Sequence, residues 1–314
     1  GRALWGGFFF VVTFFGYLVN FAGRIVKSKK KNIQAFFVFT AALLLFLTAL
    51  LGLALVYNFT YTFFSRDSLA CLPLHAHLGI IGWFLLLVTG VGSRLIPMFL
   101  ISKYTNTKLL WLVYILINTG ILLFVFLFLY SSVVSFFLIP VAALITALIL
   151  FGYYCFQSYQ QRIRRQVDEQ MKISLVSVLM MLLPFILLIG IIGLLIFNDQ
   201  NIRLVLMYGF VIFFGWITAI ILAMTFKTLP FIIWNKVYHH QAAQGKTPNP
   251  KDLFSNKVFN AMIVTYLAGF VIFLTGICFT TIFLLKAGAV FLIAAAALYN
   301  WNVLKLLLYK RVVS

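Results

Sequence analysis

Nine apolar runs, each roughly 20 residues or longer, place the strongest constraint on what this chain can fold into. A helix of that length crosses the hydrocarbon core of a bilayer. A soluble domain could not bury the apolar surface of a chain that is 64% hydrophobic. The sequence therefore predicts an all-α polytopic membrane protein with a single transmembrane domain over residues 1–314. The expected spans are 3–26, 33–57, 75–102, 108–129, 132–156, 173–197, 203–234, 257–280 and 283–306.

Positive charges gather in alternate connections and predict the orientation of the chain. The connections after the first, third, fifth and seventh runs hold most of the 24 lysines and arginines. The opposite side holds Arg2, Arg66, Arg203 and Lys286. Because lysine and arginine are enriched in cytoplasmic loops, we expect the N-terminus outside and the C-terminus in the cytoplasm. The long connections are then an external loop at 58–74 and cytoplasmic loops at 157–172 and 235–257.

The formal net charge of +19 does not indicate nucleic-acid binding, because the cations are short clusters between apolar runs. Examples are KSKKK at 27–31 and RIRR at 162–165. This arrangement is typical of loops that lie against an anionic leaflet. We therefore expect the lipid bilayer, with anionic lipids on its cytoplasmic face, as a partner, and no nucleic acid.

Two runs share a motif at equal spacing. Each has a Gly-Trp pair, ten further residues, a cation, two residues and a proline. The members are Gly82, Trp83, Arg94 and Pro97 in the third run, and Gly215, Trp216, Lys227 and Pro230 in the seventh, 133 residues later. Each residue also suits a local role, since glycine permits close helix approach, tryptophan favours an interface, a cation snorkels and proline kinks a helix. The shared spacing favours an internal duplication.

The duplication predicts a parallel unit of four helices, because both copies of the motif run from outside to inside. Many secondary transporters have inverted repeats instead. A further copy 133 residues earlier would lie before residue 1, and nine helices are not a multiple of four. We therefore expect arcs of four helices around an axis along the membrane normal, with part of one arc missing at the N-terminus.

Two of the four histidines, His75 and His77, lie at the external end of the third run. Two positions along a helix differ by about 200°, so this pair could serve two centres more readily than chelate one ion. Neutral imidazole is a good ligand for haem iron and for copper. We expect at least one of the two to be a ligand, His77 before His75. If His75 still lies in the loop, only His77 points into the bundle. The alternative is an interfacial pair that only bonds headgroups or the loop backbone. His239 and His240 are expected to form a solvated loop pair, less suited to a metal.

The acidic residues exclude some classes of function, because all five fall in connections. They are Asp67, Asp168, Glu169, Asp199 and Asp252. With no carboxylate in the membrane, a proton pump or a carboxylate-metal enzyme is disfavoured. Arg66 and Arg203 lie on the external side and are placed to pair with haem propionates. Arg94 is separated from His77 by about 25 Å of helix, so it and Lys227 lie too close to the cytoplasm for that role.

The segments HAHLGIIGW (75–83) and GVGSRLIPMF (90–99) resemble the subunit I-like proteins of the haem-copper oxidase superfamily, most of all its short bacterial members. The resemblance covers the chain from about Ile33 onward. It implies twelve helices in three arcs of four, histidine ligands towards the external side, and a place in the bacterial inner membrane. In the short members a further His-containing copy of the Gly-Trp helix precedes the part seen here. The NnrS-like family of haem- and copper-containing membrane proteins is similar in its His-Ala-His helix start.

The chain departs from the superfamily in its ligand set. A complete oxidase needs six histidines, whereas this chain has four. It lacks a helix-embedded His-His pair for copper and the Tyr or Glu that would stand beside it. Oxidase activity is therefore not expected of this chain alone.

We expect a haem protein, with copper as a further possible cofactor, in electron transfer, nitric-oxide- or oxygen-related sensing, or redox housekeeping. Respiratory-chain or other membrane subunits would be its protein partners. The alternative is a cofactor-free transporter or lipid-interacting accessory subunit, in which Arg94 and Lys227 bind anionic lipid.

Overall fold

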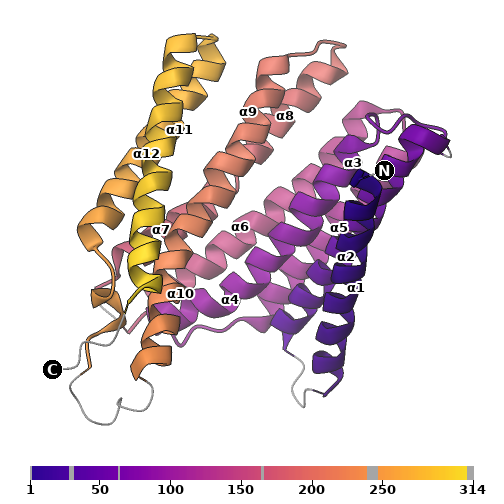
Figure 1. Cartoon of the computed structure of the whole chain (residues 1–314). Helices are drawn as coiled ribbons and strands as arrows, with labels where there is room; N and C mark the ends of the chain where they lie inside the picture. The colour runs from indigo at the N-terminus through magenta and orange to yellow at the C-terminus, as the bar shows by residue number, and fades with distance from the viewer. Residues whose placement is uncertain (1, 28–31, 63, 164–165, 239–246, 310–314) are drawn as a thin grey trace. The chain divides into compact units, whose positions relative to one another are not determined.

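The computed structural model describes residues 2–27, 32–62, 64–163, 166–238 and 247–309. The chain divides into two compact units, residues 1–165 and 166–314, which are taken separately below. The described part contains nine helices that are long and apolar enough to cross a membrane (Figure 1). The nine predicted spans are thus confirmed, and their ends differ from the prediction by a few residues.

The first unit contains an N-terminal helix followed by four further membrane-spanning segments. Its elements are α1 (Arg2–Lys27), α2 (Ile33–Tyr61), α3 (Leu72–His77), the π-helix η1 (Leu78–Leu85), α4 (Leu86–Leu100), α5 (Thr107–Tyr130), the 3₁₀ turn η2 (Val134–Phe137) and α6 (Leu138–Gln160). The elements α3, η1 and α4 form one continuous span. Helix α1 packs against α2, which packs in turn against η1 and α4. Helices α5 and α6 form a pair, and α6 also contacts α4.

The second unit consists of four spans. Its elements are α7 (Glu169–Met180), α8 (Leu183–Ile196), α9 (Ile202–Phe210), the π-helix η3 (Val211–Ile217), α10 (Thr218–Tyr238), the 3₁₀ turn η5 (Pro250–Asp252), α11 (Asn256–Phe279) and α12 (Ile282–Leu307). Helices α7 and α8 together make one span, and α9, η3 and α10 make the next. The pair α11 and α12 packs side by side, and α12 also contacts α10. This repeats the contacts of α5, α6 and α4 in the first unit.

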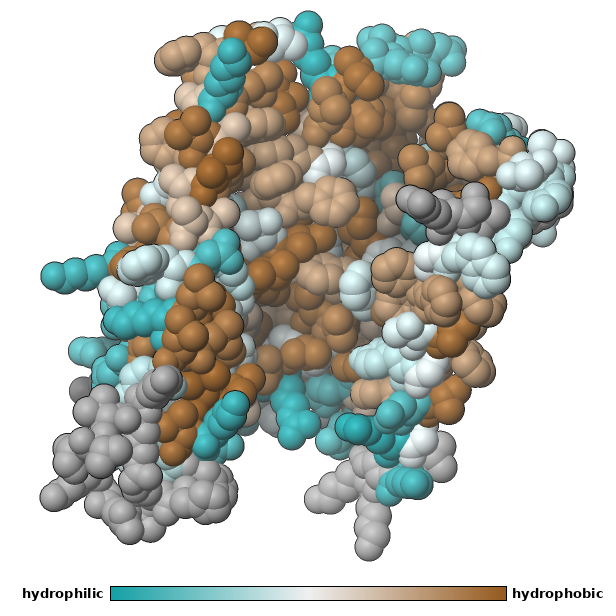
Figure 2. Space-filling view, viewed as in Figure 1, coloured by the Kyte–Doolittle hydropathy of each residue, from teal (hydrophilic) through white to brown (hydrophobic). Residues whose placement is uncertain are grey.

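The surface of the helices is apolar, as lipid contact requires. Phe9, Leu122 and Val264 are examples of large hydrophobic side chains that remain exposed. Figure 2 shows hydrophobic side chains over much of the visible helical surface, with hydrophilic residues gathered towards the helix ends. A helix satisfies its own backbone hydrogen bonds, so it can stand in lipid, where no water is present to do so. The predicted all-α polytopic membrane fold is confirmed.

The connections are shorter than predicted. Helix covers 58–61 and 72–74, so the external loop predicted at 58–74 is reduced to 62–71. Helix also covers 157–160 and 169–172 of the loop predicted at 157–172. The connection predicted at 235–257 begins after Tyr238 and contains η5, where Asn249 and Asp252 form a capping box. Polar helix ends were assigned to loops because hydropathy fades before the helix does. That residues 1–314 form one domain stays a prediction.

The two units share a buried pattern as well as the Gly-Trp motif. Helices α5 and α11 are both 24 residues long and begin 149 residues apart. Each buried position of α5 has a buried counterpart in α11 at that offset. The pairs are Leu110 with Phe259, Val113 with Met262, Ile117 with Tyr266, Gly120 with Gly269 and Ile121 with Phe270. This shared pattern supports the parallel four-helix repeat, with α2–α6 corresponding to α7–α12, and the repeat stays a prediction.

The Gly-Trp pair lies in a π-helical segment in both units. Gly82 belongs to η1 and Gly215 to η3, at the same point of the motif. Long π-helical stretches are rare, and π-bulges are frequent at functional sites. The same unusual backbone at the same register supports inheritance through the duplication.

Close contact between α2 and α4 depends on Gly90. A Cβ built on this glycine would lie 2.4 Å from the Cβ of Phe37, which is fully buried. The clashing atom is next to the backbone of α2, so it cannot rotate away. Small residues allow helices to approach closely in membranes, where packing replaces the hydrophobic effect.

Gly90→Ala should therefore lower the stability of the first unit by about 1–3 kcal/mol, the usual cost of overpacking. Unfolding in mixed detergent micelles, followed by circular dichroism, measures this change. Gly152→Ala is the matched control, since its added Cβ meets nothing within 4 Å. Equal stability of the two variants would contradict the proposed contact.

Candidate functional site

The connection between α2 and α3 is organised around the buried side chain of Asn58. Its Nδ2 donates hydrogen bonds to the carbonyl oxygen of Arg66 (3.3 Å) and to the hydroxyl of Ser68 (3.1 Å). Its Oδ1 accepts from the backbone N–H of Phe64 (2.7 Å). Pro73 then stands in the first turn of α3, where its missing N–H costs nothing. The two histidines at the end of α3 are thus held on a fixed backbone.

His75 faces α2 and borders an apolar cavity. A Cβ built on Gly52 of α2 would lie 2.8 Å from the Cε1 of His75, so the ring sits directly on this glycine. The cavity, about 270 Å³, is lined by α1 and α2, including Phe10, Phe14 and Ala49. The Nδ1 atom of His75 is buried and has no hydrogen-bond partner among the described residues. A buried polar atom left unpaired costs free energy, so this nitrogen is a candidate for binding a ligand.

His77 points the other way, as the helical spacing predicts. Its Nδ1–H donates to the carbonyl oxygen of Pro73 at 2.7 Å, because a carbonyl can only accept. Its ring packs on Phe124 of α5, with centroids 5.0 Å apart. His77 thus packs inside its unit, while His75, which belongs to α3 and not to the loop, faces α2. The bond from Nδ1 fixes the tautomer, which also suits a metal ligand.

The repeat provides an internal comparison for both histidines. The residues 133 positions later are Tyr208 and Phe210. The ring of Phe210 packs on Phe273 of α11, with centroids 4.6 Å apart, and Phe273 is the counterpart of Phe124 at the offset of 149. His77 therefore stands where the second unit uses a packing phenylalanine. Tyr208, the counterpart of His75, gives no comparable packing explanation for the His75 nitrogen that lacks a partner.

The two arginines expected on the external side have different surroundings. The guanidinium of Arg66 donates to the carbonyl oxygens of Phe128 (2.7 Å) and Leu129 (3.4 Å) at the C-terminus of α5 and lies over the Phe128 ring. A cation at a helix C-terminus is favoured by the helix dipole. Arg203 is exposed in the first turn of α9. Pairing of either arginine with haem propionates stays a prediction. The pair His239 and His240 lies outside the described residues.

The cations of the Gly-Trp motif also differ between the units. Lys227 donates to the Oδ2 of Asp168 at 2.6 Å, and its side chain is only 12% exposed. Arg94 is exposed at the equivalent position. From the sequence Asp168 is expected only as a loop acid, and its ion pair with Lys227 was not predicted. The pair could have been predicted. Alternating spans place the start of the sixth run, next to Asp168, and the end of the seventh, near Lys227, on the same side of the membrane.

The other members of the motif have structural positions. Gly82 packs against Leu44 of α2, and Gly215 against Phe270 of α11. Trp216 is buried within its unit, and Trp83 is half-buried. Both prolines, Pro97 and Pro230, are buried inside helices.

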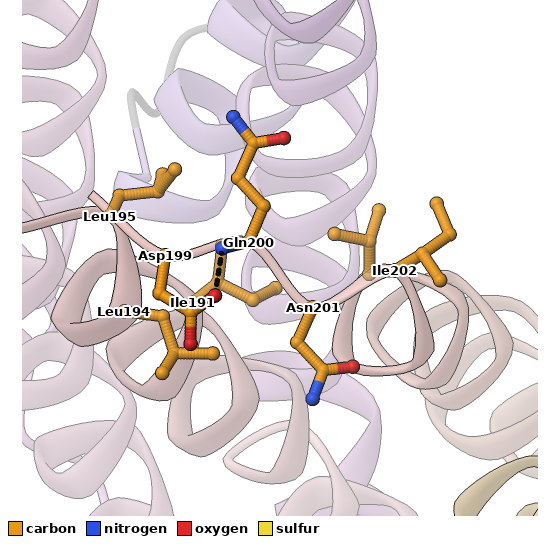
Figure 3. A pocket seen from close by; sticks show the side chains of 8 residues that line it. Ile191, Leu194, Leu195, Asp199, Gln200, Asn201 and Ile202 are labelled. Carbon is orange, nitrogen blue, oxygen red and sulfur yellow. Dashed lines mark hydrogen bonds between the residues drawn. The ribbon is translucent and has the colours of Figure 1, made fainter. Parts of the chain in front are cut away.

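A second cavity, of about 430 Å³, lies where α8 turns into α9. Figure 3 shows its lining, with Ile191, Leu194 and Leu195 from α8, and Asp199, Gln200 and Asn201 from the turn. The backbone N–H of Gln200 donates to the Oδ1 of Asp199 at 2.8 Å. The polar residues that line this cavity all come from the turn. The described part of the chain holds no group of residues that could bind a metal ion.

The donor set fits haem better than copper. The described residues contain no group of three or more His, Cys, Asp or Glu side chains that could hold a metal ion. A protein-bound copper ion needs several such donors, whereas haem iron can take a single histidine. The cavity at His75 is slightly smaller than the roughly 300–1,000 Å³ of most ligand sites. The cavity as it stands is therefore small for a whole haem ring.

Comparison with known proteins adds no relative. No protein-family model, curated protein or solved structure matches the chain. The resemblance to the haem-copper oxidase superfamily therefore stays a prediction, and function has to be inferred from the residues themselves.

His77→Phe should leave the stability of the protein nearly unchanged, since Phe210 fills the same position in the second unit. His77→Ala should lower it by about 1–2 kcal/mol, because the contact with Phe124 and the buried ring area are lost. Unfolding in mixed micelles compares the two variants. A phenylalanine variant as unstable as the alanine variant would rule out the packing role.

Proposed function

We propose that this chain is an integral membrane haem-binding protein in which His75 is a ligand of the iron. The observation that carries the proposal is the buried Nδ1 of His75, which lacks a partner in the described structure, on a residue that lines an apolar cavity. The burial of this nitrogen supports the role, since a polar atom that is kept from water without a partner is costly. Copper is supported less, for want of further donors near His75.

The residues around His75 would divide the work of binding. The imidazole would hold the group, Gly52 would leave room for the ring to lie against α2, and Phe10 and Phe14 would exclude water. Haem, when bound, supplies one-electron transfer or the binding of a diatomic gas. With four histidines in the chain, electron transfer, nitric-oxide- or oxygen-related sensing or redox housekeeping suits it better than dioxygen reduction.

We further propose a bacterial inner membrane as its location, with the N-terminus outside and the C-terminus in the cytoplasm. The uneven distribution of lysine and arginine supports this orientation. Anionic lipids at the basic face and respiratory-chain or other membrane subunits would be its partners.

The full-length protein, purified in detergent, should show a Soret absorption band and contain iron. His75→Ala should remove most of the band, because the nitrogen that would hold the iron is lost. His77→Phe is the matched control and should retain it, since that variant keeps the packing on Phe124. Absorption spectra and elemental analysis of iron and copper provide the measurement.

Ala49→Leu gives a second test, because it fills the cavity without touching the ligand; it should also reduce the haem content. A folded protein that is colourless and free of metal would refute the proposal and favour the cofactor-free transporter or accessory subunit. A folded His75→Ala variant with an unchanged Soret band would refute the role of His75.

A further inference from the structure

The two units place a cation at the same point of the Gly-Trp helix, but its surroundings differ between them. In the second unit the ammonium group of Lys227 is largely buried and bonds to the carboxylate of Asp168 at 2.6 Å. Asp168 caps the start of α7, the first helix of that unit. The negative charge in this unit is thus supplied by the protein.

In the first unit no acid is available to Arg94. Residues 1–165 contain one acidic side chain, Asp67, which lies in the connection before α3, at the opposite end of the span. No hydrogen bond or ion pair joins the guanidinium to another described residue. The residue that caps the start of α2, in the place of Asp168, is the neutral Asn32.

The position of Arg94 makes an unbalanced charge costly. It lies six residues before the end of α4 at Leu100, which is about 9 Å of helix inside that end. A guanidinium at the edge of the hydrocarbon region is costly unless it reaches a phosphate or another anion. The side chain is exposed, so an external anion can approach it.

The contact between α2 and α4 fixes what lies beside Arg94. Gly90 packs against Phe37, and the two helices run antiparallel. Arg94 lies one turn after Gly90 in α4, and Ile33 lies one turn before Phe37 in α2. Arg94 is therefore level with Ile33, which follows Asn32. Lys103, Lys108 and Arg162 follow at the same end of the unit, so an anion there meets a positive field.

We propose that Arg94 binds a phosphate group. This phosphate supplies in the first unit the negative charge that Asp168 supplies to Lys227 in the second. The ligand class is an anionic phosphate, carried by a phospholipid headgroup or present as free phosphate. Arginine suits this role because its planar fork can donate two parallel hydrogen bonds to phosphate. Lys227 has no such role, since its charge is met within the protein. This site is independent of His75 and of any haem.

The test is a thermal unfolding titration of the full-length protein in detergent. Phosphatidylglycerol should raise the unfolding midpoint of the wild type, and phosphatidylcholine should do so much less. Arg94→Gln should weaken the apparent affinity for phosphatidylglycerol about tenfold or more, as expected for the loss of a charge-assisted pair. Lys227→Gln is the matched control and should keep the wild-type affinity, even if it starts less stable.

Asn32→Asp supplies the missing acid without removing the arginine. Aspartate is as good a helix cap as asparagine, so the fold should be kept. The new carboxylate should neutralise Arg94, and the shift produced by phosphatidylglycerol should fall by more than half. This variant decides the question if Arg94→Gln does not fold.

Inorganic phosphate at millimolar concentration distinguishes the two sources. A shift that depends on Arg94 with phosphatidylglycerol alone assigns the site to a lipid headgroup, and an equal shift with inorganic phosphate assigns it to free phosphate. Either result supports the proposal. A full phosphatidylglycerol shift in Arg94→Gln or in Asn32→Asp, or no shift in the wild type, would overturn it.

Discussion

The constraint on which this structure depends is that the bilayer core contains no water to satisfy a polar group. Backbone groups meet the constraint by forming helices, and the few polar side chains meet it by finding a partner. Asn58 does so with the loop that follows α2, Lys227 with Asp168, and the Nδ1 of His77 with Pro73. The groups that lack such a partner in the described part, His75 and Arg94, are for that reason the informative ones.

The duplication makes these exceptions visible. Because two copies of one four-helix unit stand in a single chain, each position has an internal reference that has evolved under the same fold. Phe210 shows what the position of His77 requires for packing alone. Asp168 shows what the cation of the motif requires for charge balance. Such a comparison separates structural from functional roles without any related protein.

Much of the fold was predictable from the sequence, because span length and hydropathy act locally. The nine spans and the repeat followed from apolar runs and from one motif with fixed spacing. The opposite directions of His75 and His77 followed from helical geometry. The Asp168–Lys227 pair and the seat of His75 on Gly52 were not predicted. They depend on which helix faces which, and a glycine within an apolar run gives no sign of the side chain that will lie on it.

The π-helical segments carry a consequence for how this protein can vary. Each lies between two parts of a span, so it sets the rotation of His75 relative to Arg94 in one unit and of Tyr208 relative to Lys227 in the other. Removing or adding one residue there would turn one part against the other by about 100°. The ring on Gly52 would then face a different neighbour, while every residue of the motif was still present. At this point the duplicated unit can therefore change by substitution but not by insertion or deletion. The two copies have kept the same helical register while their side chains diverged.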